Sequence, residues 1–404
     1  MQIAHPPSCA QDWAFGLRKE SVMRMVLRLF LRSMVPLFCS TALAMQVGCD
    51  ATPADTGEVM MPDMGDPSFT GCRMGSGQAT SSASCQPLAT DYQPGKSVAA
   101  WPACVSDGNA YVPVNPNIST VARITAFEDI ARLLWECDKV PSPQDFADAK
   151  VQLSIANGLQ SRIDRREDEH YPLFVNSMGQ TLCTDPVQSM TQPERCIGPV
   201  KMVPILNAAV AAGAAGQEPR LNAARIEGVL LWFLYTSVYK EAVTCGRDKL
   251  DDCDSSWAYF TGGAARGSAG SGFMRYSKVA DAKATDRVYD ASLAVRCWRD
   301  VDRMLPPGNT SLQSQAYSQL DRALDRALAV VVMDRLGYMK RDTGERKAAD
   351  WAFISLTAGA LDRAARIKDA AAATTLRAEA QKTDPATVQI DVMQAALQQL
   401  FPCG

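Results

Sequence analysis

The sequence predicts an all-α fold: a multi-helix bundle with long disulfide-pinned loops, preceded by a signal peptide and a disordered tether. Apolar residues recur at helical spacing through most of the chain beyond residue 99, and strand-like alternation is nearly absent. The cysteines gather between the helical segments. We therefore divide the 404 residues into a signal peptide (1–48), a flexible lipoprotein tether (49–98) and an α-helical body (99–404).

The N-terminal segment has the layout of a secretory signal peptide. An uncharged stretch of 15 residues, Ser33 to Val47, follows Arg24, Arg28 and Arg32. It is too short to span a membrane comfortably, so we expect it to be cleaved rather than retained as an anchor. Residues 1–22 fit no part of such a signal, and translation could begin after them.

Two cleavage patterns compete at the end of this stretch. Residues 42–44, Ala-Leu-Ala, suit ordinary signal peptidase, whereas Val47-Gly48-Cys49 resembles a lipobox, with Gln46 where that pattern prefers leucine. We expect lipidation of Cys49, so that the membrane is a partner through the lipid anchor. The expected location is the envelope of a Gram-negative cell, at the outer membrane or the periplasmic face, and not the cytoplasm.

The tether is predicted from composition. Residues 49–98 are rich in small and polar side chains, carry five acidic residues between Asp50 and Asp66, and show no hydrophobic periodicity. Such a segment cannot bury enough apolar surface to offset the entropy lost on ordering.

The cysteine count supports both export and lipidation. Thirteen cysteines less Cys9 and Cys39, which precede the cut, leave eleven, and lipidation of Cys49 leaves ten. An even set in an exported chain is typical of disulfides. Proximity in sequence and exclusion suggest the pairs Cys72–Cys85, Cys104–Cys137, Cys183–Cys196, Cys245–Cys253 and Cys297–Cys403.

Helix signals follow one another along the body. Ile124, Phe127 and Ile130 begin an amphipathic stripe, and Ser142-Pro143 opens a helix expected to reach about Arg166. A helix from Pro219 to about Val243 is apolar nearly all round, which places it at the centre of the bundle. Further helices are predicted at 286–304, 311–339, 347–369 and 384–400, with a proline-broken loop or short hairpin at 105–118 and long loops at 171–200 and 244–285.

Composition excludes several functions. His170 is the one histidine of the processed chain and the cysteines lack paired CxxC spacing, so we expect neither a metal site nor a cofactor. The net charge is −3 without a basic stripe, so nucleic acid is not an expected partner. The mixed-sign run Arg162–Glu169 before His170 is typical of a solvated face, a histidine–carboxylate ligand pair being the alternative.

Other charged segments have ordinary structural interpretations. The glycine-rich run 262–272, with Arg266, is predicted to be a flexible loop, the alternative being a lid over an anion. Asp321 and Asp325 alternate with arginines at helical spacing, which favours ion pairs on an exposed face. Asp286 and Asp290 form a weaker pair of the same kind.

Charged and aromatic residues emerge where the central helix ends. Charged groups leaving a core helix need partners, and an arginine of the following helix could supply them. A salt-bridge network under a pinned loop is one interpretation, and a polar ligand pocket is the other. The pocket hypothesis names Glu227, Lys240, Glu241, Asp254, Trp257, Tyr259 and Arg287.

Part of this region resembles a known family. Lys240-Glu241 followed by Asp254, Trp257, Tyr259, Phe260 and Gly262, after a lipoprotein-like start, is similar to the imelysin-like helical envelope proteins. The resemblance covers about 40 residues and implies a helical-bundle envelope protein, in some members linked to iron uptake. The family's Gly-x-His-x-x-Glu signature is absent from this sequence.

The functional expectation is a lipid-anchored envelope protein with a helical binding or scaffolding role, whose partner is an envelope protein or a small molecule. No Gly-x-Ser-x-Gly elbow is present, and no catalytic residue is identified. The alternative is a hydrolase acting on envelope carbohydrate or peptide through carboxylates, which are the remaining general acids.

Overall fold

Helices form almost all of the regular structure, as the sequence predicts. The computed structural model describes residues 86–96, 98–154, 158–171, 175–176, 179–180 and 182–402. Of the two units into which the chain divides, Met1–Pro62 and Asp63–Gly404, these residues belong to the second. The predicted lipidation site Cys49, the predicted signal peptide and the predicted pair Cys72–Cys85 lie outside the described residues.

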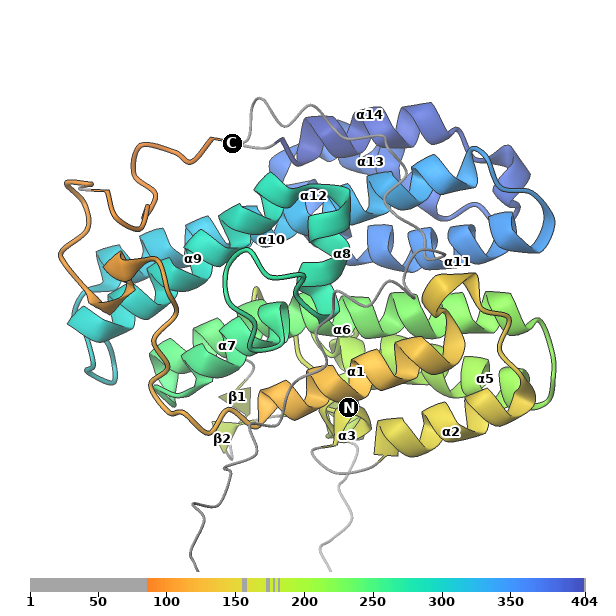
Figure 1. Cartoon of the computed structure of the whole chain (residues 1–404), viewed down its shortest axis with the longest axis horizontal. Coiled ribbons are helices and arrows are strands. Elements are labelled where there is room, and N and C mark those ends of the chain that lie inside the picture. Colours follow the sequence, from red (N-terminus) through yellow and green to blue (C-terminus); the bar gives the residue numbers. More distant parts are fainter. Residues whose placement is uncertain are drawn as a thin grey trace, which may run out of the picture. The chain divides into compact units, whose positions relative to one another are not determined.

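Fourteen α-helices occur in the described part of the chain (Figure 1). They are α1 (Thr120–Leu134), α2 (Pro143–Ser154), α3 (Leu159–Ile163), α4 (Pro186–Thr191), α5 (Val203–Ala214), α6 (Pro219–Arg247), α7 (Asp252–Thr261), α8 (Gly272–Ala280), α9 (Ala282–Val301), α10 (Thr310–Met339), α11 (Gly344–Ala360), α12 (Asp362–Lys368), α13 (Ala370–Ala380) and α14 (Ile390–Leu400). Shorter elements are η3 (Val105–Gly108), η4 (Glu136–Asp138), η5 (Gly198–Met202) and η6 (Pro385–Thr387). Two short strands, β1 (Val175–Asn176) and β2 (Gly179–Gln180), pair antiparallel.

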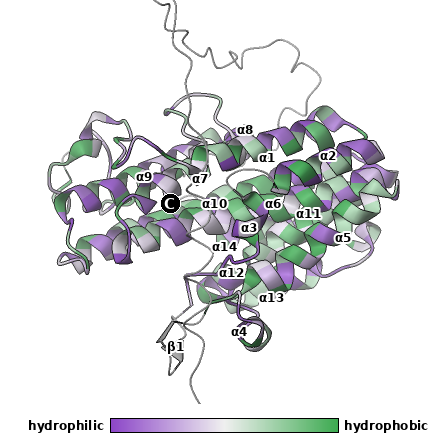
Figure 2. Cartoon of the chain, turned by 90° about the horizontal axis from the view of Figure 1, so that it is seen from below, coloured by the Kyte–Doolittle hydropathy of each residue, from purple (hydrophilic) through white to green (hydrophobic). Residues whose placement is uncertain are grey.

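The centre of the bundle is α6, as its apolar sequence predicts. It packs against α5, α7, α10 and α11, and Ile226, Leu230, Phe233 and Leu234 are fully buried. Figure 2 shows hydrophobic residues predominating where α6 and α11 lie next to each other. A helix that is apolar on all sides has to be surrounded by other helices.

The helix predicted from Pro143 to Arg166 is broken, which corrects the sequence interpretation. Helix α2 ends at Ser154 and α3 covers only Leu159–Ile163. Gly158 lies between them with a φ of +60°, a left-handed conformation that glycine adopts without steric cost.

Both predicted long loops contain helices, so these predictions were wrong. Residues 171–200 hold the β1–β2 hairpin and α4, which Asp185 caps by accepting from the amides of Val187 and Gln188. Residues 244–285 hold α7 and α8, and α7 ends at Gly262, which has a φ of +68°. Helix α4 has a side-chain cap at its start and α7 a glycine cap at its end, whereas α8 is amphipathic but only nine residues long.

The C-terminal part consists of more and shorter helices than predicted. The helix expected at 347–369 is two helices, α11 and α12, which meet at Leu361. The helix expected from 384 begins as the short η6 and continues as α14. Helices α5 and α13 were not predicted, because alanines on all faces conceal their periodicity.

The ordered body begins before residue 99, which corrects the predicted end of the tether. Tyr92 is 2% exposed, and its backbone amide donates to Gln319 Oε1 at 2.8 Å. The Gln319 amide donates back to the Tyr92 carbonyl at 3.0 Å, and the Tyr92 hydroxyl donates to Asp107 at 2.8 Å. A buried aromatic residue with three such bonds fixes this segment to α10.

Two predicted disulfides are present and two are not. Cys183–Cys196 and Cys245–Cys253 form as predicted. Cys104 pairs with Cys297, with a Cα–Cα distance of 5.3 Å, instead of Cys104 with Cys137 and Cys297 with Cys403. The reason is that η3 lies along α9, where the amide of Val105 donates to Asp300. Cys137 is also disulfide-bonded, but not to Cys104, and Cys403 lies outside the described residues.

Within the described residues, none of the helices combines the length and the apolar character needed to cross a membrane.

Candidate functional site

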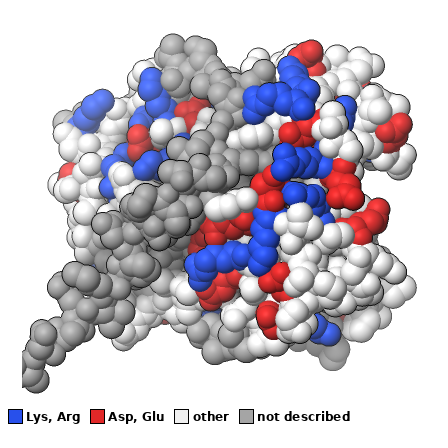
Figure 3. All heavy atoms as spheres, turned by 45° about the vertical axis from the view of Figure 1, so that its right-hand side comes forward, with Lys and Arg blue, Asp and Glu red and all other residues white. Residues whose placement is uncertain are grey.

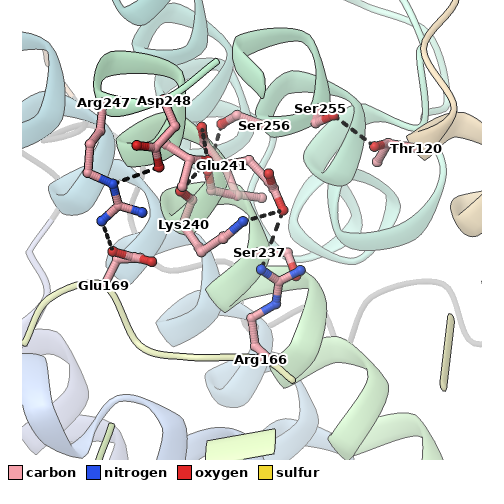
Figure 4. Close-up of polar contacts among 12 residues, drawn as sticks. Thr120, Arg166, Glu169, Ser237, Lys240, Glu241, Arg247, Asp248, Ser255 and Ser256 are labelled. Atoms are coloured by element: carbon pink, nitrogen blue, oxygen red, sulfur yellow. Dashed lines mark hydrogen bonds and ion pairs between the residues drawn. The ribbon is translucent and has the colours of Figure 1, made fainter. Parts of the chain in front are cut away.

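The seven residues of the pocket hypothesis do not converge on one cavity. Lys240 Nζ and Arg166 Nη1 both approach Glu241 Oε1, at 3.3 and 3.4 Å (Figure 4). Arg166 is 3% exposed and lies over the rings of Phe233 and Tyr259. This is the salt-bridge network that was the alternative to a pocket.

The same network corrects the prediction of a solvated face at Arg162–Glu169. Arg166 is buried, and the side chain of Glu167, 13% exposed, is paired with Arg195 at 2.8 Å. Glu169 is paired with Arg247, which also contacts Asp248 (Figure 4). Part of the mixed-sign run is covered here, because partners on the segment after α4 and on α6 neutralise Arg166, Glu167 and Glu169, while Arg165 stays exposed.

Asp254 and Trp257 hold the segment before α1 in place. Asp254 is 1% exposed and accepts from the Tyr111 hydroxyl at 2.9 Å and from the Asn115 amide at 2.7 Å. The rings of Trp257 and Tyr111 stack with a centroid distance of 4.5 Å. These contacts explain the two residues as structural anchors.

Arg287 belongs to a third cluster, around the glycine-rich run. Its guanidinium contacts Asp290 at 2.9 Å, and Arg266 contacts both Asp290 and Asp286. Arg266 also lies 4.6 Å above the Tyr289 ring. Asp290 is 4% exposed whereas the Asp286 side chain is 48% exposed, so only Asp290 departs from the predicted exposed face, and Arg266 is directed at the protein rather than at a ligand.

Glu227 is the predicted residue that lines a half-open cavity between the helices. This cavity measures about 270 Å³ and lies among α1, η4, α6, α8, α10 and α11. Its apolar walls are formed by Leu134, Trp135, Ala223, Ala224, Tyr276, Val279, Val331, Tyr338 and Ala349. A cavity of this kind has the size and the apolar character of a small-molecule site.

The basic groups of this cavity are paired with carboxylates, four of them with carboxylates of the lining and Lys139 with Asp145 outside it. Five basic residues, Lys139, Arg220, Arg275, Arg335 and Arg346, face five acidic residues, Glu136, Asp138, Glu227, Asp334 and Asp350. Each basic residue has a carboxylate partner within 4 Å. Figure 3 likewise shows basic and acidic side chains alternating along one face of the molecule. A charged ligand would have to break an existing ion pair.

Arg335 organises the inner end of the cavity. It contacts Glu227, 3% exposed, and Asp350, 1% exposed, the latter at 3.3 Å. Burial opposes its charge, but the two carboxylates outweigh burial and raise the pKa of Arg335 above its ordinary value. Glu227 also accepts from the Tyr276 hydroxyl at 2.9 Å, and that hydroxyl accepts from Trp135 Nε1 at 2.8 Å.

A second, partly buried cluster surrounds His170. Its Nδ1 lies 2.7 Å from Asp168 and its Nε2 lies 2.6 Å from Asp321, while the ring stacks on Tyr239 with a centroid distance of 3.8 Å. Burial lowers the pKa of His170, but the two carboxylates outweigh it and raise the pKa to about 8. Since both nitrogens are bonded, neither is available as a general base. Among the described residues no group of His, Cys, Asp and Glu is arranged to hold a metal ion.

Asp325 is not on an exposed face, contrary to the prediction. It is fully buried, accepts from the Tyr235 hydroxyl at 2.8 Å and contacts Lys368 at 2.9 Å. Burial, together with the charge of Asp321, raises the pKa of Asp325. Asp321 itself joins His170, and the hydrogen bond from His170 outweighs burial and lowers the pKa of Asp321.

Sequence reasoning missed Arg335, Asp350 and Tyr276 as cavity residues. Asp334-Arg335 interrupts the apolar run of α10, and Asp350 precedes the buried Trp351, so charges within apolar runs were the available signal. Their meeting with Glu227 depends on the packing of four helices, α6, α8, α10 and α11.

Comparison with known proteins identifies no relative of this chain. The chain matches no family model, no curated protein and no solved structure. Functional argument therefore comes from the residues themselves.

Proposed function

We propose that this chain is a cell-envelope binding protein that holds a small, uncharged and mainly apolar molecule in the 270 Å³ cavity. The observation that carries the proposal is the pairing of every basic side chain of the lining with a carboxylate. A net charge on the ligand would go uncompensated, whereas apolar surface would be removed from water against Trp135, Tyr276 and Tyr338.

The proposed location is the envelope, with Cys49 as the lipid attachment site and residues 1–48 as the signal peptide. Three disulfides in the described part of the chain support an oxidising compartment. The resemblance to imelysin-like proteins stays a prediction of the same kind: a helical protein in the envelope.

Binding is tested with a neutral naphthylamine fluorophore, whose emission rises in an apolar site. Ala349 lines the cavity, and Ala348, its half-buried neighbour on α11, does not. We expect Ala349→Phe to weaken probe binding about tenfold or more by filling the cavity, and Ala348→Phe to leave it unchanged. Equal binding by both variants, or tighter binding of a sulfonated analogue of the probe, would refute the proposal.

Localisation is tested separately. We expect the protein to incorporate labelled palmitate and to sediment with membranes, and Cys49→Ala to lose both properties, while Cys39→Ala retains them because Cys39 is removed with the signal peptide. A mature N-terminus at Met45 without lipid would instead identify cleavage after Ala44.

The hydrolase alternative has less support. Asp168 and Asp321 are the carboxylates brought closest to a common partner, but they are bonded to opposite nitrogens of one imidazole. Asp325, with its raised pKa, is fully buried and out of reach of a large substrate.

A further inference from the structure

A second, smaller cavity lies beside the His170 cluster. It measures about 70 Å³ and is bounded by residues 168–171, residues 194–201, α6, α10 and the junction of α11 with α12. Both cavities touch α6, the larger as far as Glu227 and the smaller from Trp232 onward. At a rise of about 1.5 Å per residue these positions are roughly 8 Å apart along the helix, and the two linings share no residue, so the two sites are distinct.

The most unusual group in this cavity is the guanidinium of Arg363. Its side chain is 14% exposed, yet its closest carboxylate contacts are 3.7 Å to Asp168 and 3.6 Å to Asp321, beyond hydrogen-bond length. Nη2 is buried and has no acceptor among the described residues. A buried guanidinium with unused N–H groups is costly unless an acceptor reaches it.

The two nearest carboxylates are already engaged. Each accepts or shares the proton of one nitrogen of His170, at 2.7 and 2.6 Å, which explains why Arg363 stays at a longer distance. Asp362, also in the lining, is paired with Arg366 at 3.2 Å and with Arg377 at 2.8 Å. Glu194 is the remaining acidic residue of the cavity, and Lys201 lies in the same lining.

Neutral hydrogen-bond donors complete the lining. Thr236, 6% exposed, brings a hydroxyl and Trp232 brings an indole N–H from successive turns of α6. Donors on several sides of a cavity of this size suit an acceptor with several oxygens, and a planar guanidinium suits a carboxylate or a phosphate in a bidentate arrangement.

We propose that this cavity binds a small oxyanion, a carboxylate or phosphate group, with Arg363 as its anchor and Thr236 and Trp232 as further donors. The volume admits one such group, either as a free ion or as the end of a larger molecule. Lys201 and Arg366 at the opening add positive charge, and Glu194 opposes it.

The test is calorimetric titration of the purified protein with inorganic phosphate and, separately, with acetate, at constant ionic strength set by KCl. We expect saturable binding of at least one of them, loss of binding in Arg363→Gln, and binding about tenfold weaker in Thr236→Val, which keeps the side-chain shape. We expect Glu194→Gln to bind more tightly. Arg303→Gln, which removes an exposed arginine away from the cavity, should bind as the unchanged protein does.

The two probes distinguish the two kinds of oxyanion, because a phosphate site should prefer phosphate and a carboxylate site should accept acetate. The Thr236→Val variant keeps the test valid if Arg363→Gln fails to fold. No saturable binding of either ion, or binding unchanged in Thr236→Val and in folded Arg363→Gln, would overturn the proposal.

Discussion

Two charge clusters in this protein have the same composition, one cation between two carboxylates, but differ in burial and in how they are built. Arg335 lies between Glu227 and Asp350, and its cluster is supplied by the long helices α6, α10 and α11. His170 lies between Asp168 and Asp321, and its cluster joins α10 to residues 164–171, which precede the disulfide loop Cys183–Cys196.

The difference between the clusters is chemical as well as architectural. Arg335 keeps its charge at any pH at which the protein is folded, because the pKa of Arg335 is raised further by its partners. His170, with a pKa raised to about 8, loses its charge within an accessible range. The first cluster is therefore a permanent part of the core, and the second is sensitive to pH and to the loop that carries it.

The largest effect is expected from Arg335→Met. The substitution leaves Glu227 and Asp350 buried without their cation, so we expect the free energy of unfolding in urea to fall by about 3–5 kcal/mol. Adding Glu227→Gln and Asp350→Asn should restore part of the loss. A single variant as stable as the unchanged protein would show that the charges are solvated and the cluster is not structural.

Loss of the disulfide Cys183–Cys196 should affect the His170 cluster alone. In the chain-entropy account, Cys183→Ser with Cys196→Ser costs about 3 kcal/mol for a loop of 13 residues. We expect faster hydrogen exchange in residues 164–201 and unchanged exchange around Arg335. Equally faster exchange around Arg335 would show that the disulfide stabilises the whole body and not this segment.

The pH dependence of stability should come from His170 on the alkaline side. Its folded pKa of about 8 exceeds the ordinary value of 6.5, so its stabilisation is complete below about pH 6.5 and is lost as the pH rises through 8. This difference between the two pKa values corresponds to about 2 kcal/mol in the free energy of unfolding. We expect unfolding measurements from pH 6 to 9 to show this fall, and His170→Gln to flatten it; an equal slope in both proteins would assign the effect elsewhere.

At acidic pH the same cluster contributes a pH dependence of stability with the opposite sign. Hydrogen bonding with His170 outweighs burial and holds the pKa of Asp168 and of Asp321 below the ordinary 3.8. Their stabilisation is therefore present above about pH 4 and is lost as the pH falls through the lowered values.

The smallest effect is expected from Tyr276→Phe in the Arg335 cluster. The change removes one hydrogen bond to Glu227 and leaves Trp135 Nε1 without its acceptor, so we expect a loss of about 1 kcal/mol. Urea unfolding checks it, with Tyr317→Phe, which removes a bond to a backbone carbonyl, as the comparison. A loss as large as that of Arg335→Met would mean that the hydroxyl, rather than the guanidinium, stabilises Glu227.

The helical segments could be predicted wherever a long apolar stripe was present. Helices α1, α6, α9 and α10 lie close to the predicted ranges, because their buried faces repeat at helical spacing over many residues. The helices inside the two predicted loops could not be found in this way. Each of them has only two or three turns, so end signals such as Asp185-Pro186 indicate where they begin.

The candidate sites were less predictable than the helices. The sequence pointed to Glu227, but six other residues of the pocket hypothesis lie in separate clusters, and His170 was placed on a solvated face. Burial of a charge depends on partners far away in the chain: Asp321 is 151 residues from His170, and Arg335 is 108 residues from Glu227.

The sequence by itself determined the all-α class, the central position of α6 and the two short disulfide loops, because helical spacing and loop closure are local properties of the chain. Only the tertiary structure decided which charges are buried together, that Cys104 joins Cys297, and that paired ions surround a cavity. These outcomes depend on which helices pack side by side, since a buried ion needs a partner of opposite charge that no local pattern identifies.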